Sequence, residues 1–477
     1  MRYKKTARSH AIRLIAVFPN CTWLIFLLAA ASPAFSKEPA RKPNVLFLFT
    51  DDQRADTIGA LGNPIIKTPA MDSLVRRGFT FRNAYCSGGN SGAVCTPSRN
   101  MLLSGKSYFR WSGPLAPGDA PNFPLSMKDA GYQTYHHGKR GNTALNIQER
   151  FEINKYLAND LEDRVDGEPG RSIVDGAITF LKERKEDRPF FMYLAFGNPH
   201  DPRVAAKKYL DLYQRDAIPL PKNFLPVHPF DNGEMIIRDE LLAPWPRTGD
   251  EIRRHLQEYY AVISGLDHHM GRLLQSLKEQ GLFENTIIIF SSDQGLAVGS
   301  HGLMGKQNLY DDGMRVPLIF AGPGIPRGKS DALVYLHDIY PTVCDLVGEK
   351  IPAGLDGISF KPVLSGKTKT ARDSLFFSYM NVQRALRDHD WKLILYPQIN
   401  KTQLFDLRKD PDEINDRSAE PTQAARIVRM MTELQQWQTR LGDTQLLVSE
   451  VPKDSQFTPP SEEALNKLMK RWEEKSK

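Results

Sequence analysis

Three apolar runs constrain the fold of this chain more than any other feature of its sequence. They are NVLFLFT at 44–50, PFFMYLAF at 189–196 and TIIIF at 286–290, and polar residues follow each of them closely. Continuous apolar runs of this length are typical of parallel strands that are buried on both faces. Polar groups at the carboxyl ends of such strands form the ligand site of an open α/β sheet. The runs therefore predict an α/β fold with a functional site at one edge of its sheet.

The pattern changes after about residue 370. Before it, segments with helical spacing, such as 173–183 and 258–280, lie between the strand-like runs. After it, short strand-like runs at 376–379, 383–387 and 391–396 precede a helical stretch at 422–438. We expect a larger domain over residues 37–370 and a smaller α+β subdomain with an antiparallel sheet over residues 371–477. The proline-rich segment 218–245 is interpreted as an irregular surface insertion.

Residues 1–36 predict a secretory signal peptide. A basic start precedes an apolar stretch at about 23–31, and Ala34-Phe35-Ser36 provides small residues for cleavage. The alternative is an uncleaved membrane anchor, but the apolar stretch is short for a span of roughly 20 residues. We expect an exported protein, periplasmic or secreted, without stable membrane insertion.

The net charge of +7 gives little reason to expect a nucleic-acid partner. Five of the 63 Lys and Arg residues, and none of the 56 Asp and Glu residues, belong to the predicted signal peptide. The remaining chain is close to neutral, so we expect no nucleic-acid binding. Three cysteines follow the predicted signal peptide: Cys86, Cys95 and Cys344. An odd number of cysteines indicates a reactive or unpaired thiol rather than a disulfide framework.

The segment CTPSR at 95–99 is the most specific motif of the sequence. It resembles the C-x-P-S-R signature of the formylglycine-dependent sulfatases of the alkaline-phosphatase-like superfamily, and MLLSG at 101–105 matches that family's continuation. The resemblance extends over roughly residues 43–320 and is greatest to iduronate-type and polysaccharide-degrading bacterial members. It implies an alkaline-phosphatase-like α/β/α sandwich with a smaller C-terminal α+β domain, and a sulfatase catalytic domain over residues 37–370.

The resemblance implies that Cys95 is oxidised to formylglycine. The partner would be a formylglycine-generating enzyme or an anaerobic sulfatase-maturating enzyme. A hydrated aldehyde has two hydroxyls on one carbon, so one attacks sulfur and deprotonation of the other expels sulfate. A thiolate would be a poor sulfate acceptor because its product has no easy exit. The alternative is a buried, inert cysteine at the start of a helix.

A metal site is implied by residues at two strand ends. Asp51 and Asp52 match the paired aspartates of the sulfatase site, and Asp293 and Gln294 match the second ligand pair, with Cys95 as a further ligand. The family usually has Asn or His at the position of Gln294, which offers the same amide oxygen from a longer stem. Clustered oxygen ligands suit Ca²⁺, and Mg²⁺ less well. The cation would polarise the sulfate group. Taken alone, the Asp pair is also compatible with a solvated strand end.

Four basic residues match sulfate-contacting positions of the family, namely Arg99, Lys139, His200 and Lys306. Cations that converge on one anion stabilise the charge that develops on the sulfuryl oxygens. Arg99 would also hold the formylglycine. Either His200 or Lys306 would protonate the leaving alkoxide, and we favour His200. Each of these residues alone would be compatible with a surface charge.

One position departs from the family. A histidine usually follows two or three residues after the equivalent of Lys139 and is often assigned to deprotonating the formylglycine hydrate, whereas this chain has Arg-Gly-Asn at 140–142. The candidates to replace it are His136 and His137, or Asn142 as a hydrogen-bond partner only. The two histidines are also compatible with ordinary packing. His301 is a candidate for the wall of the substrate pocket.

Together these features predict an enzyme, a sulfuric ester hydrolase that acts on a sulfated carbohydrate in polysaccharide degradation. A phosphonate monoester or phosphodiester hydrolase on the same scaffold is an alternative, because such enzymes share C-x-P-S-R. Choline sulfatase is a further alternative. The last alternative is a degenerate, non-catalytic binder of sulfated glycans, and it is suggested by the histidine that is missing after Lys139.

Overall fold

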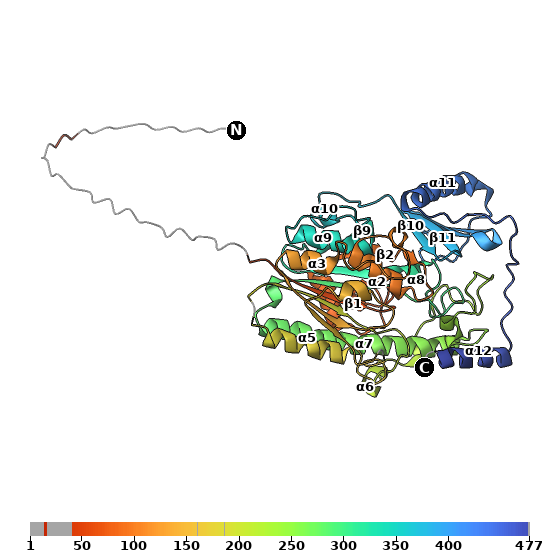
Figure 1. Cartoon of the computed structure of the whole chain (residues 1–477), viewed down its shortest axis with the longest axis horizontal. Coiled ribbons are helices and arrows are strands. Elements are labelled where there is room, and N and C mark those ends of the chain that lie inside the picture. The colour runs from red at the N-terminus through yellow and green to blue at the C-terminus, as the bar shows by residue number, and fades with distance from the viewer. Residues whose placement is uncertain (1–13, 17–40, 160, 186, 476–477) are drawn as a thin grey trace, which may run out of the picture. The chain divides into compact units, whose positions relative to one another are not determined.

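The computed structural model describes residues 14–16, 41–159, 161–185 and 187–475 (Figure 1). Lys42–Lys477 form one compact unit. The predicted signal peptide, residues 1–36, lies outside the described residues except for 14–16. In the described part of the chain, no helix has the length and apolar character that a bilayer crossing requires.

The centre of the unit is a sheet that has eight strands within the described residues, in the order β5-β4-β6-β1-β7-β8-β2-β9. Their bounds are β1 (Asn44–Thr50), β2 (Phe79–Tyr85), β4 (Gln133–Gly138), β5 (Ile153–Tyr156), β6 (Phe190–Ala195), β7 (Thr286–Ser292), β8 (Arg315–Ala321) and β9 (Gly328–Tyr335). β5, β4, β6, β1 and β7 are parallel, whereas β8 is antiparallel to both of its neighbours. The three apolar runs of the sequence are β1, β6 and β7, and all the residues of these strands are buried.

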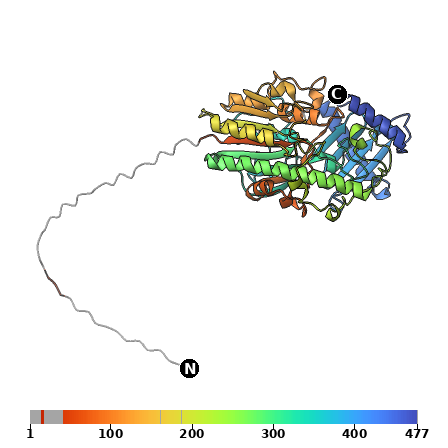
Figure 2. The same ribbon diagram turned by 90° about the horizontal axis from the view of Figure 1, so that it is seen from below.

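Helices cover both faces of this sheet (Figure 1). Those below it in the view are α5 (Arg171–Glu183), α6 (Lys207–Leu210) and α7 (Gly249–Glu279), and α7 is seen lengthwise in Figure 2. α1 (Pro69–Arg77) packs against α7. Those above it are α2 (Cys95–Ser104), α3 (Phe123–Asp129), α8 (Asp311–Met314), α9 (Ile339–Leu346) and α10 (Lys361–Leu364). α4 (Leu145–Gln148) packs against α2. Each face has its own apolar cluster: Phe47 and Phe49 of β1 belong to one, and Leu46 and Leu48 to the other. The predicted α/β/α sandwich is confirmed.

The smaller C-terminal sheet is also confirmed. It has the order β13-β12-β11-β10-β3 and consists of β3 (Gly88–Gly89), β10 (Ser374–Tyr379), β11 (Gln383–Asp388), β12 (Trp391–Tyr396) and β13 (Lys401–Asp406). All its pairs are antiparallel except β10 with β3. α11 (Ala424–Leu441) packs against β11, and α12 (Glu462–Lys475) follows. The boundary between residues 370 and 371 stays a prediction, and β3 joins the smaller sheet from far earlier in the chain.

The register of the parallel strands brings their carboxyl ends together. Thr50 of β1 pairs with Ser292 of β7, Phe49 pairs with Ala195 of β6, and Ala195 pairs with Gly138 of β4. The chain therefore leaves all four strands at the same edge of the sheet. The polar residues that follow these strands in the sequence are placed side by side by this edge.

Candidate active site

Acidic side chains from the ends of β1 and β7 meet the first residue of α2. One ligand atom from each of Asp51, Asp52, Cys95 and Asp293 lies within 4.8 Å of the others, and all four residues are buried. The backbone N–H groups of Asp52 and Gln294 both donate to Asp293 Oδ1, each at 3.0 Å. Asp52 has a φ of +66°, a left-handed conformation that is uncommon outside glycine. The two strand ends are thus held together as one donor cluster.

This cluster fits a hard divalent cation. Gln294 Oε1 is buried and has no hydrogen-bond partner in the described part of the chain, while its Nε2 donates to Asp52 Oδ1 at 2.5 Å. Burial, with Asp51 as the next cause, raises the pKa of Asp293 to about 6. An unsatisfied amide oxygen beside three carboxylates is a set of ligands that Ca²⁺ prefers. We therefore regard Asp51, Asp52, Cys95, Asp293 and Gln294 as a candidate metal site.

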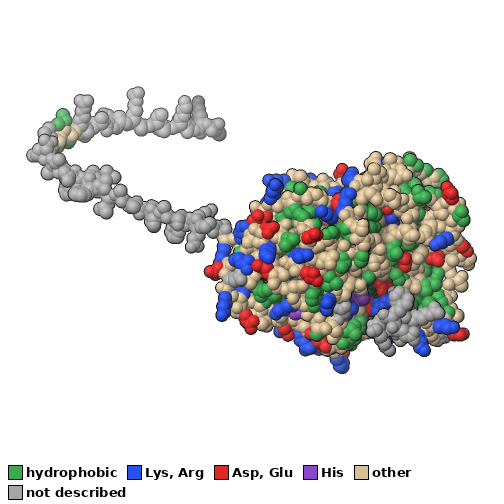
Figure 3. Space-filling view, viewed as in Figure 1, with side chains coloured by type: hydrophobic (Ala, Val, Ile, Leu, Met, Phe, Trp, Pro, Cys, Tyr) green, Lys and Arg blue, Asp and Glu red, His purple; other side chains and the backbone are tan. Residues whose placement is uncertain are grey.

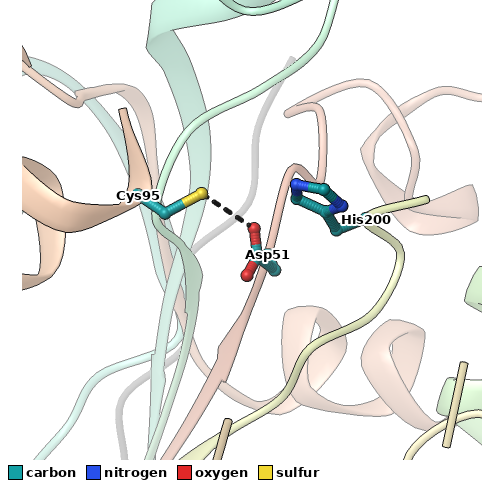
Figure 4. Close-up of side chains that lie close together, drawn as sticks. All are labelled: Asp51, Cys95 and His200. Carbon is teal, nitrogen blue, oxygen red and sulfur yellow. Dashed lines mark hydrogen bonds between the residues drawn. The ribbon is translucent and has the colours of Figure 1, made fainter. Parts of the chain in front are cut away.

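Cys95 lies at the centre of the site as the first residue of α2. Its Sγ is 3.1 Å from Asp51 Oδ1 (Figure 4), 3.0 Å from Gln294 Nε2 and 3.3 Å from Lys306 Nζ. Burial, followed by the nearby carboxylates of Asp293 and Asp51, raises the pKa of the Cys95 thiol well above its ordinary value. A thiolate is therefore disfavoured at this position.

Arg99, one turn along α2, joins the two strand ends. Its guanidinium is fully buried, and it donates from Nε to Asp293 Oδ2 at 2.9 Å and from an Nη atom to Asp51 Oδ2 at 3.2 Å. Burial alone would raise the pKa of Asp51, but Lys139 and Arg99 outweigh it and hold that pKa well below its usual range. Asp51 is therefore an ionised carboxylate with two cationic neighbours.

The other predicted cations surround the same cluster. Lys139 follows β4 and forms an ion pair with Asp51, and Lys306 Nζ lies 2.8 Å and 2.9 Å from the two carboxylate oxygens of Asp52. His200, which follows β6, has its Nε2 3.8 Å from Asp52 Oδ2. Figure 4 shows Cys95 and His200 on opposite sides of the Asp51 carboxylate. The structure thus brings all the predicted catalytic and metal-binding residues together.

The two histidines of β4 make other contacts. His136 Nδ1 lies 2.7 Å from Asn154 Oδ1, and burial lowers the pKa of His136 to about 3. His137 lies so close to Gly176 of α5 that a Cβ there would be 2.7 Å from its Nδ1, and burial lowers its pKa to about 4. Both are therefore neutral side chains packed against the neighbouring elements.

His301 and Asn142 are the other two predicted substrate-binding residues. The ring of His301 stacks on Tyr310 with a centroid distance of 3.8 Å, and its Nε2 is 3.0 Å from Asn223 Nδ2. Asn142 is exposed and has a φ of +48°. In the described part of the chain, neither these two residues nor the β4 histidines form a hydrogen bond with Cys95, and their substrate-binding role stays a prediction.

Comparison with known proteins decides the family. The sulfatase family model matches residues 43–349, and a model described as N-sulphoglucosamine sulphohydrolase, C-terminal, matches residues 299–440. The chain belongs to the sulfatase family. It is an enzyme, a hydrolase of that family. Its fold is the one expected from the resemblance of CTPSR, at 95–99, to the signature of that family.

Relatives of this sulfatase include an N-acetylglucosamine-6-O-sulfatase of Bacteroides thetaiotaomicron, which is 27% identical over 89% of this chain and 92% of that protein. A solved structure in complex with its substrate D-glucosamine-2-N,6-O-disulfate has a TM-score of 0.73 and 24% identity, and covers 85% of this chain and 99% of that one. The phosphonate monoester hydrolase of Agrobacterium radiobacter has a TM-score of 0.72 and 21% identity, over 88% and 100% of the two chains. The two structures show the fold alone.

A set of charged residues beside His200 in this sulfatase was not predicted from the sequence. Asp201 is buried next to it, and Arg238 and Asp239 come from the short 3-10 helix η4 (Arg238–Leu242). Arg238 donates to Asp201 Oδ1 at 2.7 Å and to Asp239 Oδ1 at 3.2 Å. Asp201 could have been noticed in the sequence because an acidic residue directly follows the predicted proton donor, His200. Arg238 lies in the segment 218–245, whose composition gave no indication that it reaches the site.

Proposed function

We propose that this sulfatase removes sulfate from a sulfated carbohydrate, with a formylglycine made from Cys95 as its nucleophile and Ca²⁺ as its metal. The observation that carries the proposal is the position of Cys95. Its side chain lies in contact with a carboxylate, an amide and a lysine at the meeting point of two strand ends. A nucleophile at this position faces both the cation ligands and the cations that would hold a sulfate group.

The environment of Cys95 disfavours a thiol nucleophile. Since the pKa of the thiol is raised, little thiolate would exist at neutral pH. Formylglycine would supply a hydrated aldehyde with one hydroxyl for attack on sulfur and a second for the release of sulfate. We propose a formylglycine-generating or anaerobic sulfatase-maturating enzyme as the partner that makes it.

The donor set supports Ca²⁺ over Mg²⁺. The candidate ligands are carboxylate and amide oxygens of buried residues, and Mg²⁺ usually keeps several of its waters. When bound, the cation would polarise the sulfate group and lower the pKa of the attacking hydroxyl. Arg99 and Lys139, which are buried with the acidic residues, offset part of the negative charge of Asp51 and Asp293.

His200 is the better candidate for the proton donor to the leaving oxygen. Lys306 Nζ is buried and lies 2.8 Å and 2.9 Å from the two carboxylate oxygens of Asp52. The ordinary pKa of a lysine, about 10.4, makes it a poor acid near neutral pH and a good electrostatic partner for sulfate. His200, whose side chain is 16% exposed, borders the site where a leaving alcohol would depart.

A carbohydrate substrate is supported by the names of the relatives. The N-acetylglucosamine-6-O-sulfatase shares nearly its whole length with this chain. The phosphonate monoester hydrolase shares the fold, which does not discriminate between the two reactions. We also propose export, periplasmic or secreted, on the basis of the predicted signal peptide in residues 1–36.

The test is sulfate release from a panel of sulfated mono- and oligosaccharides by protein co-produced with a formylglycine-generating enzyme. We expect Cys95→Ala to abolish release, and the matched variant Cys344→Ala, a buried free cysteine in α9, to retain it. Binding of sulfated sugars without any turnover, with the aldehyde confirmed by peptide mass, would contradict the proposal and support a non-catalytic glycan binder.

A further inference from the structure

We propose that Arg238 is a positioning residue for the proposed proton donor: it holds Asp201, and Asp201 holds His200 in the orientation that the leaving oxygen requires. The inference rests on the proposed function. It concerns a residue of the segment 218–245, which the sequence places outside the catalytic motifs. Three linked contacts support it.

The first contact is between Arg238 and Asp201. Arg238 Nη1 donates to Asp201 Oδ1 at 2.7 Å, and its Nη2 forms an ion pair with Asp201 Oδ2. This is a bidentate pair, which fixes the plane of the carboxylate as well as its position. Asp201 is only 7% exposed, so its carboxylate has little water to replace Arg238.

The second contact is between Asp201 and His200. His200 Nδ1 lies 2.7 Å from the backbone carbonyl oxygen of Asp201 and 3.4 Å from its Oδ1. A carbonyl oxygen only accepts, so Nδ1 carries the hydrogen of this bond, and Nε2 is the ring nitrogen left to face the leaving oxygen. Nε2 faces the site, 3.8 Å from Asp52 Oδ2. The groups behind Nδ1 therefore set where Nε2 points.

The third contact anchors Arg238 itself. Arg238 Nη1 also donates to Asp239 Oδ1 at 3.2 Å, and Asp239 Oδ2 accepts from Gln307 Nε2 at 2.8 Å. Gln307 Nε2 in turn donates to the carbonyl oxygen of Gly92 at 2.9 Å. Gln307 adjoins Lys306, and Gly92 lies three residues before Cys95. Arg238 thus joins the segments that carry the proton donor, a sulfate-binding lysine and the nucleophile.

The consequence is selective for the leaving group. A sugar alkoxide needs a proton as the ester bond breaks, whereas a nitrophenolate leaves without one. A misdirected His200 would therefore slow the hydrolysis of a sugar sulfate more than that of 4-nitrophenyl sulfate. A general loss of structure would slow both reactions equally.

The experiment compares kcat of Arg238→Met and Arg238→Lys on a sugar sulfate cleaved by the native enzyme and on 4-nitrophenyl sulfate. We expect Arg238→Met to lower kcat on the sugar sulfate by about 10- to 100-fold, which is a fraction of the usual contribution of general acid catalysis. On the aryl sulfate, kcat should fall by less than about 3-fold. Arg238→Lys, a single point charge, should recover part of the loss.

Two further variants keep the test specific. Arg110→Met is a matched control because it breaks a similar ion pair, between Arg110 and Asp356. The Arg110 side chain is 37% exposed and that of Arg238 is 39% exposed. We expect this variant to change kcat on the two substrates by the same factor. In a His200→Ala background, Arg238→Met should have no additional effect on the sugar sulfate. Equal losses on both substrates, or a full additional loss in that background, would overturn the inference. Absence of sulfate release by the native enzyme would instead overturn the proposed function.

Discussion

At the scale of single residues, the site consists of charged side chains that are buried together. Arg99, Asp51 and Asp293 have no exposed side-chain surface, and Lys139 and Lys306 have almost none. Removal of one member of a buried ion pair typically costs about 3–5 kcal/mol, because the remaining charge is left uncompensated. Single substitutions at Arg99 or Asp293 therefore affect folding as well as catalysis, and they are poor tests of the metal site.

Gln294 provides a better test of that site because it is uncharged. Its Oε1 has no hydrogen-bond partner in the described part of the chain, so the bonds that a variant loses are those from Nε2 to Asp52 and Cys95. We expect Ca²⁺ to raise the melting temperature of the native protein, since a ligand at 100 times its Kd stabilises by about 2.7 kcal/mol. Gln294→Leu should lose at least about half of that shift because one oxygen ligand is gone. The matched variant Gln53→Leu, whose buried amide lies against Met71, should keep it. An equal shift in all three proteins, measured by thermal unfolding with and without Ca²⁺, would contradict the assignment.

Adjacency in the sequence decided which of these residues were predictable. Asp51, Cys95 and Lys306 lie in short motifs, so the residue types alone indicated their positions. His301 also lies between two motifs, but its position in the sequence did not indicate where its side chain points. In the structure it has a left-handed φ of +55°, and its ring stacks on Tyr310. The direction of a loop side chain depends on packing against distant segments, which the local sequence does not contain.

At the scale of elements, close contacts between backbones place the start of α2. β3 pairs with β10, and a Cβ at Gly88 would lie 2.0 Å from the carbonyl oxygen of Ser378. A Cβ at Gly89 would lie 2.4 Å from Cγ of Pro97. Only glycine allows this approach, so the smaller sheet helps to hold the segment before Cys95. The apolar runs predicted the strands of the large sheet, but a two-residue strand of glycines has no pattern from which to be predicted.

The contact between α1 and α7 gives a prediction about pH. Asp267 of α7 accepts hydrogen bonds from the backbone N–H groups of Ala70 at 2.9 Å and Met71 at 2.7 Å, and burial raises its pKa from 3.8 to about 7. Between these two values the folded state keeps a proton that the unfolded state has released. The free energy of unfolding should therefore fall as pH rises from about 4 to 7, by up to about 1.4 kcal/mol per pH unit from this group.

Asp267→Asn removes the titrating group and keeps one acceptor oxygen. The quantity to measure by urea unfolding is the free energy of unfolding at pH 5 minus that at pH 7. We expect this difference to be smaller in the variant than in the native protein. An unchanged difference would show that Asp267 does not contribute to the pH dependence.

At the scale of the whole molecule, the end of the chain supports the segment that carries Arg238. After α11 the chain continues to α12 (Figure 1), and α12 packs against η4. On the way, Asp231 N donates to the carbonyl oxygen of Ser455 at 2.8 Å, and the Phe457 ring lies 5.6 Å from that of Trp245. These contacts join segments more than 200 residues apart, so no local pattern predicted them.

We expect Phe457→Ala to lower kcat on the sugar sulfate about 2- to 10-fold, because loss of the aromatic contact lets the segment 218–245 move. Leu446→Ala, at a side chain 74% exposed after α11, should have no effect. Equal kcat values for Phe457→Ala and the native enzyme, from initial rates at saturating substrate, would contradict a supporting role for the C-terminal segment.

The basic residues of the site are separate from the charges on the face shown in Figure 3. On the face shown in Figure 3, basic and acidic side chains are interspersed. The basic residues of the site, Arg99, Lys139 and Lys306, are buried at the sheet edge instead. Under the proposed function, these residues would hold a single sulfate group that enters the site.

The most direct test of the central claim is the ratio of kcat/KM for a sugar sulfate and for the phosphate ester of the same sugar position. The protein would carry formylglycine confirmed by peptide mass, and Ca²⁺ would be present. We predict a preference for sulfate of at least about tenfold, which corresponds to about 1.4 kcal/mol of transition-state stabilisation. An equal or higher kcat/KM for the phosphate ester would contradict the assignment as a sulfuric ester hydrolase.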